Sequence, residues 1–173
     1  DGLSSSGTVK LSTNSTIYTP TVNNASAITL GTGSSIGGDL VATATLGDLS
    51  DAGSLTVGGT TSLTTSQADA TITADGLSSS GTVTLSTNGA SGDATVVNAT
   101  TLDLGTSTVG GDLIATATTG NVTDSGVVTV TGTTSLTTSQ ANDDIDVDSL
   151  ASTGAVTLST NGGTGNATIV NAS

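Results

Sequence analysis

The sequence predicts an all-β protein that folds as a parallel β-helix, a β-solenoid with about 18–24 residues in each coil. Three observations predict it: an internal repeat of 73–74 residues, short segments of alternating apolar and polar residues, and a composition dominated by 39 Thr, 25 Ser and 24 Gly. Thr favours strands because its branched Cβ suits a pleated sheet. Glu, Arg and Met, which favour helices, are absent.

The chain contains two whole repeats and part of a third. Residues 1–14 return at 75–88 with a single change, Lys10 to Thr84, and return more loosely at 148–161. The phrase Gly-Gly-Asp-Leu-Val-Ala-Thr-Ala-Thr starts at Gly37 and recurs at Gly110 with Ile in place of Val. We therefore expect a single solenoid segment over residues 1–173, divided into repeats 1–74, 75–147 and a partial repeat 148–173.

Alternating segments of four to seven residues, separated by Gly, Asn, Asp and Ser, are the expected strands. In the second repeat they cover residues 82–86, 94–97, 101–104, 112–117, 127–131, 135–138 and 144–148. Alternation with a period of two places one set of side chains inside and the other outside. The residues expected to face the core are Val83, Leu85, Val128, Val130, Ile145, Val147, Val156 and Leu158.

Two other interpretations of the repeat are an array of 73-residue β-sandwich domains and a disordered chain. A sandwich core spans about 10 Å and is usually filled by large side chains. This chain has no Phe or Trp, and its one aromatic residue, Tyr18, lies in a stretch that the second repeat does not reproduce. A solenoid core is narrow and can be filled by Val, Leu, Ile and Ala, so the composition favours the solenoid.

The composition excludes several classes of function. Without His and Cys the chain has no Ser-His-Asp or Cys-His chemistry and no ordinary zinc, haem or iron–sulfur site. With Lys10 as its only basic side chain and a net charge of −13, it is not expected to bind nucleic acid. Its longest apolar runs have three residues, which is too short for a membrane span. Sites that cleave glycosides use Arg, Lys, His or aromatic residues beside their carboxylates, and this chain offers only Asp for such a site. We therefore expect no enzymatic activity and no cofactor.

One acidic cluster, residues 142–148, is a candidate cation site. Asp144, Asp146 and Asp148 would share one face of a strand, and their oxygens are the ligands that Ca²⁺ prefers. The segment has neither the glycine turn of an EF-hand nor the Gly-Gly-x-Gly-x-Asp pattern of calcium-binding β-rolls. A solvated outer face is therefore the better interpretation, and no metal site is predicted.

Three other polar patterns have ordinary explanations. Thr-x-Thr pairs at 43/45, 71/73, 82/84, 116/118, 129/131 and 131/133 could bind ice if they stacked one per coil, but their spacing is irregular. Six Asn-x-Ser/Thr sequons start at Asn14, Asn24, Asn98, Asn121, Asn166 and Asn171. About four are expected by chance in so Ser- and Thr-rich a chain, so their presence does not indicate glycosylation. Asn14, Asn88 and Asn161 follow Leu-Ser-Thr at matching positions and are predicted to be turn residues in a left-handed conformation.

Three phrases of the sequence resemble the shaft repeats of filamentous haemagglutinin-like proteins. They are the phrase starting at Gly110, Gly-Val-Val-Thr-Val-Thr-Gly-Thr-Thr-Ser-Leu-Thr-Thr at Gly126, and Gly-Ser-Leu-Thr-Val-Gly-Gly at Gly53. The resemblance covers essentially the whole chain and identifies a type of shaft. It implies a right-handed β-helix, export by two-partner secretion or as an autotransporter passenger, and a place on the bacterial cell surface. The secretion domain and the barrel of those families do not occur in this sequence.

The expected function is structural: a shaft segment of a large, secreted, extracellular adhesin or filament, without catalysis. The alternative is a binding module that adheres to glycans or surfaces through its Thr-, Ser- and Asn-rich face. The expected partner is another coil, either in a longer chain or in a second copy stacked end to end. We expect the chain to continue past Ser173 with x-[Leu/Ile]-x-Leu-Gly, because the second repeat continues in this way after Thr100.

Overall fold

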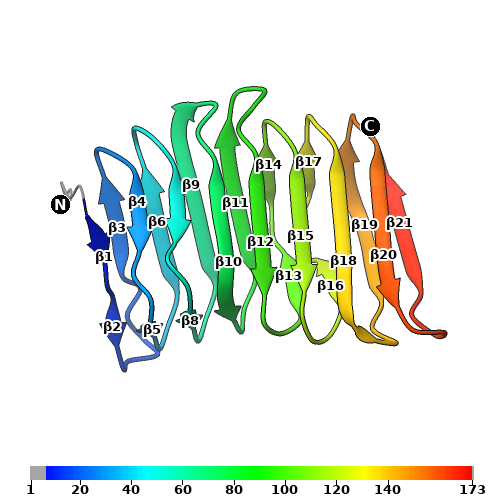
Figure 1. Ribbon diagram of the computed structural model, residues 1–173, viewed down its shortest axis with the longest axis horizontal. Coiled ribbons are helices and arrows are strands. Elements are labelled where there is room, and N and C mark those ends of the chain that lie inside the picture. Colours follow the sequence, from blue (N-terminus) through cyan, green and yellow to red (C-terminus); the bar gives the residue numbers. More distant parts are fainter. Residues whose placement is uncertain (1–6, 173) are drawn as a thin grey trace.

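The computed structural model describes residues 7–172, which form one parallel β-solenoid (Figure 1). The first residues of the first repeat, 1–6, and Ser173 lie outside the described residues. Every strand pairing in residues 7–172 is parallel, and this part of the chain contains no helix. The prediction of an all-β parallel solenoid is confirmed.

Two sheets face each other across the core. The first sheet has eleven strands: β1 (Thr8–Val9), β2 (Ser12–Thr13), β4 (Ile28–Leu30), β5 (Ser34–Ile36), β7 (Leu49–Asp51), β8 (Leu55–Val57), β10 (Ile72–Ser79), β12 (Ala94–Asn98), β15 (Leu113–Ala117), β18 (Thr134–Ala141) and β20 (Val156–Asn161). The second sheet has ten: β3 (Thr21–Asn24), β6 (Leu40–Ala44), β9 (Thr61–Ala68), β11 (Val83–Asn88), β13 (Leu102–Leu104), β14 (Ser107–Val109), β16 (Val122–Asp124), β17 (Val128–Val130), β19 (Ile145–Ser152) and β21 (Ala167–Asn171).

The coils are short and regular. The main path of the first sheet, β1-β4-β7-β10-β12-β15-β18-β20, runs through eight coils. Residues paired in successive coils are 19 positions apart at the shortest, from Ala94 to Leu113, and 23 at the longest, from Leu49 to Ile72. The predicted length of 18–24 residues per coil is confirmed. The spread arises at the turns, where Gly, Ser and Thr residues are added or lost without disturbing the strands.

One sequence repeat spans three and a half coils. β3 in the first repeat and β12 in the second are equivalent in sequence, yet β3 belongs to the second sheet and β12 to the first. From β3 the second sheet runs through β6 and β9 to β11, which is three coils, and β12 follows half a coil later. Successive repeats therefore present the same side chains on opposite faces of the solenoid.

The repeats are joined without a linker. β10 runs across the boundary between residues 74 and 75, and β19 runs across the boundary between 147 and 148. β11 of the second repeat pairs with β9 of the first along the same sheet. This continuity excludes an array of separate sandwich domains.

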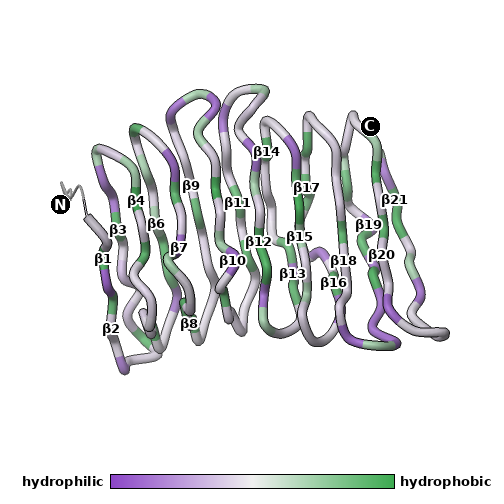
Figure 2. The backbone as a smooth tube through the Cα atoms, viewed as in Figure 1, coloured by the Kyte–Doolittle hydropathy of each residue, from purple (hydrophilic) through white to green (hydrophobic). Residues whose placement is uncertain are grey.

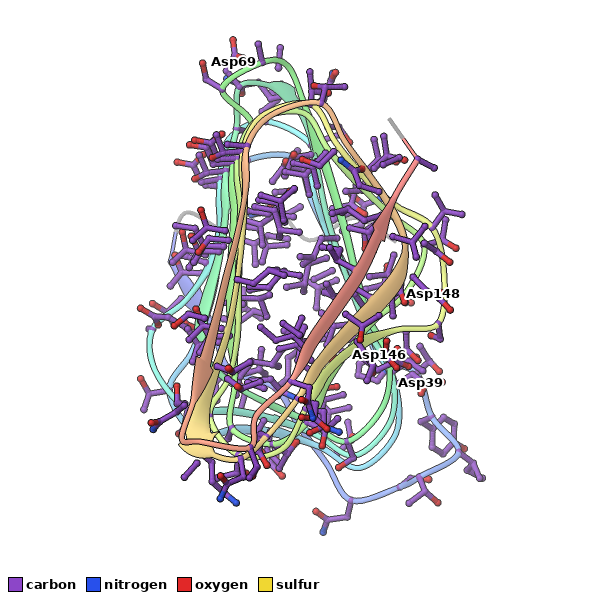
Figure 3. The ribbon with its side chains drawn as sticks, turned by 90° about the vertical axis from the view of Figure 1, so that its right-hand side faces the viewer. Asp39, Asp69, Asp146 and Asp148 are labelled. Carbon is purple, nitrogen blue, oxygen red and sulfur yellow. The ribbon has the colours of Figure 1, made fainter. Side chains whose placement is uncertain are left out.

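The core is a stack of aliphatic side chains between the two sheets (Figure 3). Six of the eight residues predicted to face inward are fully buried: Val83, Leu85, Val128, Val130, Ile145 and Val147. The other two, Val156 and Leu158, lie in the last coil and pack against the core while half-buried. Strongly hydrophilic segments lie mostly at the turns (Figure 2).

The prediction that Asn14, Asn88 and Asn161 adopt a left-handed conformation is wrong. In residues 7–172 the non-glycine residues with positive φ are Asp69 (63°) and Asn142 (70°). Asn88 and Asn161 end β11 and β20 with extended backbones, and the left-handed residues are the glycines that follow them. Glycine takes this conformation without steric cost, so the asparagine before it does not have to.

Candidate functional site

The Gly-Gly-Asp phrase forms a corner that links one coil to the next. Oδ1 of Asp39 accepts a hydrogen bond from the Thr60 amide at 2.7 Å, and Oδ1 of Asp112 accepts one from the Thr133 amide at 2.6 Å. These backbone hydrogen bonds hold the pKa of both carboxyls below the ordinary value, because they favour the ionised form. The carboxylates at these corners therefore act as braces between coils.

The same arrangement recurs along the solenoid with other carboxylates and amides. An Asp or Asn side-chain oxygen accepts from a backbone amide of the following coil in Asp48–Thr71, Asp69–Ser91, Asp93–Asp112, Asn121–Asp144, Asn142–Thr164 and Asp144–Asn166. Each bond replaces a solvent hydrogen bond that the turn amide would otherwise make. Much of the acidic character of the chain is thus engaged in supporting its turns.

The glycines of the corner are required by close approach. A Cβ at Gly111 would overlap Oδ1 of Asp93 and lie 3.1 Å from the Asp93 nitrogen. A Cβ at Gly38 would lie 2.6 Å from the carbonyl oxygen of Tyr18. No side chain larger than hydrogen fits where successive coils turn so closely above one another.

A buried asparagine supports a second corner, and the sequence interpretation missed it. Asn98 is fully buried. Its Oδ1 accepts from the Ser79 amide at 2.7 Å, and its Nδ2 donates to the carbonyl oxygens of Ser79 at 3.0 Å and Thr101 at 2.7 Å. The equivalent Asn171 makes the same pair of bonds to the amide and carbonyl of Ser152. The Asn-Ala-Ser/Thr phrase that recurs in each repeat is the only sequence signal of this clamp.

These contacts decide the status of several sequons. Asn24 and Asn98 are both fully buried, and each Nδ2 donates to the carbonyl oxygen of its own turn, Ala27 or Thr101, at 2.7 Å. A side-chain amide enclosed in this way is inaccessible to a glycosyltransferase in the folded protein. Asn14 and Asn166 are exposed.

The surroundings of Asp51 disfavour the ionised form of its carboxyl group. Burial raises its pKa above the ordinary value, and the nearby Asp75 carboxyl raises it further, although a hydrogen bond from the Gly76 amide at 3.0 Å acts in the opposite direction. Its Oδ1 is buried and accepts no hydrogen bond. Asp103 likewise has one buried oxygen without a partner, while the other accepts from the hydroxyls of Thr82 and Ser125.

The acidic segment 142–148 does not form a cluster of converging ligands. Asp146 and Asp148 are exposed and project outward from β19 (Figure 3). Asp144 precedes the strand and accepts from the Asn166 amide at 2.7 Å, while Asp148 accepts from the Ser149 hydroxyl at 2.9 Å. Among the described residues no three acidic side chains gather as a metal-binding group.

Hydroxyl side chains form a ladder along the outside of the first sheet. Thr8, Thr29, Ser50, Thr73, Thr95, Ile114, Ser135 and Thr157 pair in register through eight coils, and all but Ile114 carry a hydroxyl. The Thr-x-Thr pairs themselves do not stack on one another: Thr43 pairs with Thr64, and Thr116 with Thr137, neither of which belongs to a pair. The paired array that would suit ice is therefore not formed.

No pocket is found in residues 7–172. Nor does this part of the chain contain a helix long and apolar enough to cross a membrane. The described surface presents the hydroxyl ladder and the braced corners. It also exposes a few large apolar side chains: Ile17, Tyr18, Leu46, Ile114, Val127 and Val170.

Comparison with known proteins identifies the repeat. A family described as repeats of unknown function (DUF5649) matches residues 18–86 and 91–159, which together are more than half of the chain. The two matched stretches have the same length and lie one repeat apart. No curated protein and no solved structure matches the chain. Nothing in these comparisons links it to filamentous haemagglutinin-like proteins or autotransporters.

Proposed function

Because the chain belongs to the DUF5649 family of repeats, and because its repeats join without a linker, we propose that it is a structural shaft segment of a large, secreted bacterial cell-surface protein. Its role is to supply length and stiffness and to resist proteolysis. A Thr- and Ser-rich exterior with almost no Lys, Arg or Glu supports an extracellular place. No catalytic step is part of the proposal.

The single observation that carries the proposal is the continuity of β10 and β19 across the repeat boundaries. Flexible linkers between domains would act as hinges, whereas a hydrogen-bonded strand at the boundary transmits bending and torsion to the next repeat. The corner braces add further bonds between coils, such as that from the Thr60 amide to Asp39. A chain built in this way gains length in proportion to its repeats.

We further propose that another coil covers the edge of β20 and β21, either in the same chain or from a second copy. Val156, Leu158 and Ile169 are only partly buried at this edge. Their equivalents one repeat earlier, Val83, Leu85 and Val96, are fully buried beneath the following coil. A further coil in the same register would bury Val156, Leu158 and Ile169 equally well.

The experiment uses tandem arrays of two, four and six repeats. Small-angle scattering should give a rod whose length grows by about 17 Å per repeat, since strands stack at about 4.8 Å per coil. The arrays should also resist a broad-specificity protease at all lengths. A length that levels off with added repeats, or cleavage at each boundary, would contradict the shaft.

The alternative, a binding module, is supported by the outward hydroxyl ladder from Thr8 to Thr157. A glycan array and a set of mineral and polymer surfaces, probed with the two-repeat chain, separate the two functions. The shaft proposal expects no saturable binding. Saturable binding that is lost when Thr73 and Thr95 are replaced by Lys would favour the binding module.

A further inference from the structure

We propose that the folded chain modifies itself at Asn88-Gly89 and Asn161-Gly162, where each asparagine deamidates through a cyclic imide. The two sites occupy the same place in successive repeats, at the end of β11 and of β20. Both asparagines are exposed. They are the two asparagines of the ten in the chain that glycine follows.

The nucleophile of this reaction is the backbone nitrogen of the glycine. In the described part of the chain the amides of Gly89 and Gly162 donate no hydrogen bond. Other amides of the same turn are engaged: that of Gly92 donates to the Gly89 carbonyl, and that of Ser91 to the Asp69 carboxylate. Glycine has no Cβ to obstruct the approach of its nitrogen to the side-chain carbonyl of the residue before it.

The chemistry needs only water as a co-reactant. The glycine nitrogen gives up its proton to solvent base and forms a bond to Cγ of the asparagine, and the Cγ–Nδ2 bond breaks with release of ammonia. Water then adds to one of the two imide carbonyls. Opening at Cγ leaves aspartate, and opening at the backbone carbon leaves isoaspartate, in which the main chain runs through the side chain.

One hydrogen bond to a backbone carbonyl holds each of the two asparagine side chains. Nδ2 of Asn88 donates to the Ser66 carbonyl at 3.4 Å, the long limit of a hydrogen bond, and Nδ2 of Asn161 donates to Ser139 at 2.7 Å. Each is a single bond at an exposed position. By contrast, the buried Asn98 makes hydrogen bonds through both its oxygen and its nitrogen.

The product disturbs the inter-coil ladder at this corner. The carbonyl oxygen of Asn88 accepts from the Asp69 amide at 2.6 Å, and that of Asn161 accepts from the Asn142 amide at 2.6 Å. In an isoaspartate the main chain runs through Cβ and Cγ and gains one carbon, and this carbonyl becomes part of a free carboxylate, which takes it out of the ladder. At Asn88 a new carboxylate also comes close to the carboxylate of Asp69, which repels it. Deamidation would therefore loosen these turns as the protein ages.

The test compares folded and denatured chain held in the same mildly alkaline buffer. Peptide mapping follows the mass change from amide to acid, and a protease that cleaves before aspartate but not before isoaspartate identifies the product. We expect conversion at Asn88 and Asn161 in the folded chain, with isoaspartate present at both. Asn98 should convert in the denatured chain only.

Two controls keep the result decisive. Asn14, followed by Ser15, is an exposed internal reference that should convert more slowly, because its neighbour carries a Cβ. The variant with Asn88→Gln and Asn161→Gln should keep its melting temperature through the incubation, while the unsubstituted chain loses part of its own. Conversion at Asn88 and Asn161 in the denatured chain but not in the folded chain would overturn the proposal.

Discussion

Each strand residue has one of two environments, and the side chain that occupies it must match. Val128 is fully buried in β17, whereas its neighbour Thr129 is exposed on the outer face and pairs with Thr108 of the preceding coil. Val128 lies within a cluster of buried apolar side chains, so a charge placed there would be neither solvated nor paired. An outward position keeps its contact with solvent.

Val128→Asp should therefore lower the free energy of unfolding by at least about 3 kcal/mol. Thr129→Asp should lower it by about 0.5–1 kcal/mol, the cost of a poor strand former in a sheet that already carries negative charge. Urea titration followed by far-ultraviolet circular dichroism measures both. Similar losses for the two variants would show that the assigned faces are wrong.

The direction of a carboxyl's pKa shift depends on its surroundings. Asp39 and Asp112 have a lowered pKa because backbone amides stabilise the ionised form, so they stabilise the fold above the ordinary carboxyl pKa and cease to do so as pH falls through their own. Asp51 has a raised pKa because burial and Asp75 favour its protonated form. It therefore favours folding at low pH and loses that contribution as pH rises through its pKa.

Two variants should separate these effects in melting curves recorded from neutral to acidic pH. Asp39→Asn should reduce the fall in melting temperature on acidification, because it removes a group that must be protonated. Asp51→Asn should raise the melting temperature at neutral pH, with a gain that shrinks towards acid. A lower melting temperature for Asp51→Asn at neutral pH would mean that its bond to the Gly76 amide outweighs burial and repulsion.

At the residue level the sequence predicts which strand residues face inward, but not which side chains form hydrogen bonds between coils. The inward positions of Val83 and Leu85 follow from the period of two, which needs no knowledge of neighbouring coils. The partners of Asn98 and Asp112 lie on adjacent coils, 19–21 residues away. Coil lengths vary from turn to turn, so the sequence does not specify which residues stack. From the sequence alone, Asn98 is therefore identified only as part of a sequon. The left-handed conformation is likewise assigned to Asn88, although Gly89 adopts it.

The turns are the elements whose local sequence is most restricted. A Gly-Gly-Asp corner stacks directly on the corner below: the Gly111 amide donates to Gly92, and the Gly132 amide donates to Gly111, at 3.0 and 2.9 Å. The recurrence of the phrase could be recognised in the sequence. Its cause, the close approach of one coil to the next, becomes visible only once the coils are in register.

Gly111→Ala should lower the free energy of unfolding by about 1–3 kcal/mol, because the new methyl group displaces the Asp93 carboxylate and with it the bond to the Asp112 amide. Gly163→Ala is the matched control. A Cβ there meets nothing within 4 Å, and its φ is not left-handed. Gly163→Ala should leave the free energy of unfolding unchanged or raise it by up to about 1 kcal/mol, because alanine restricts the conformations of the unfolded chain. Thermal unfolding of the two proteins side by side measures the difference, and equal losses would contradict a corner that excludes side chains.

For the whole molecule, the relation between repeat and coil determines what the surface presents. A repeat of three and a half coils relates equivalent residues by a half turn as well as a translation, as β3 and β12 show. The repeat length was visible in the sequence, but the half coil was not, because it depends on the sum of several variable turns. The solenoid therefore has two equivalent faces, each carrying the same hydroxyl side chains in alternate repeats.

Spin labels on engineered cysteines can test the half coil, since the chain has no cysteine of its own. Thr64 in β9 and Thr137 in β18 are equivalent in sequence but lie on opposite sheets. Thr64 and Thr129 share the second sheet, three coils apart, through Ser86 and Thr108. The control pair should be separated by about 14 Å, three strand spacings of about 4.8 Å.

The equivalent pair should be separated by at least about 20 Å, because the axial distance of about 17 Å combines with the distance of about 10 Å between the two sheets. Labels on each pair should leave the melting temperature nearly unchanged, since all three side chains point outward. If both pairs gave the shorter distance, each repeat would contain a whole number of coils. Equivalent side chains of successive repeats would then all lie along one side of the solenoid. The longer distance for Thr64 and Thr137 means that successive repeats present equivalent side chains on opposite sides of the solenoid.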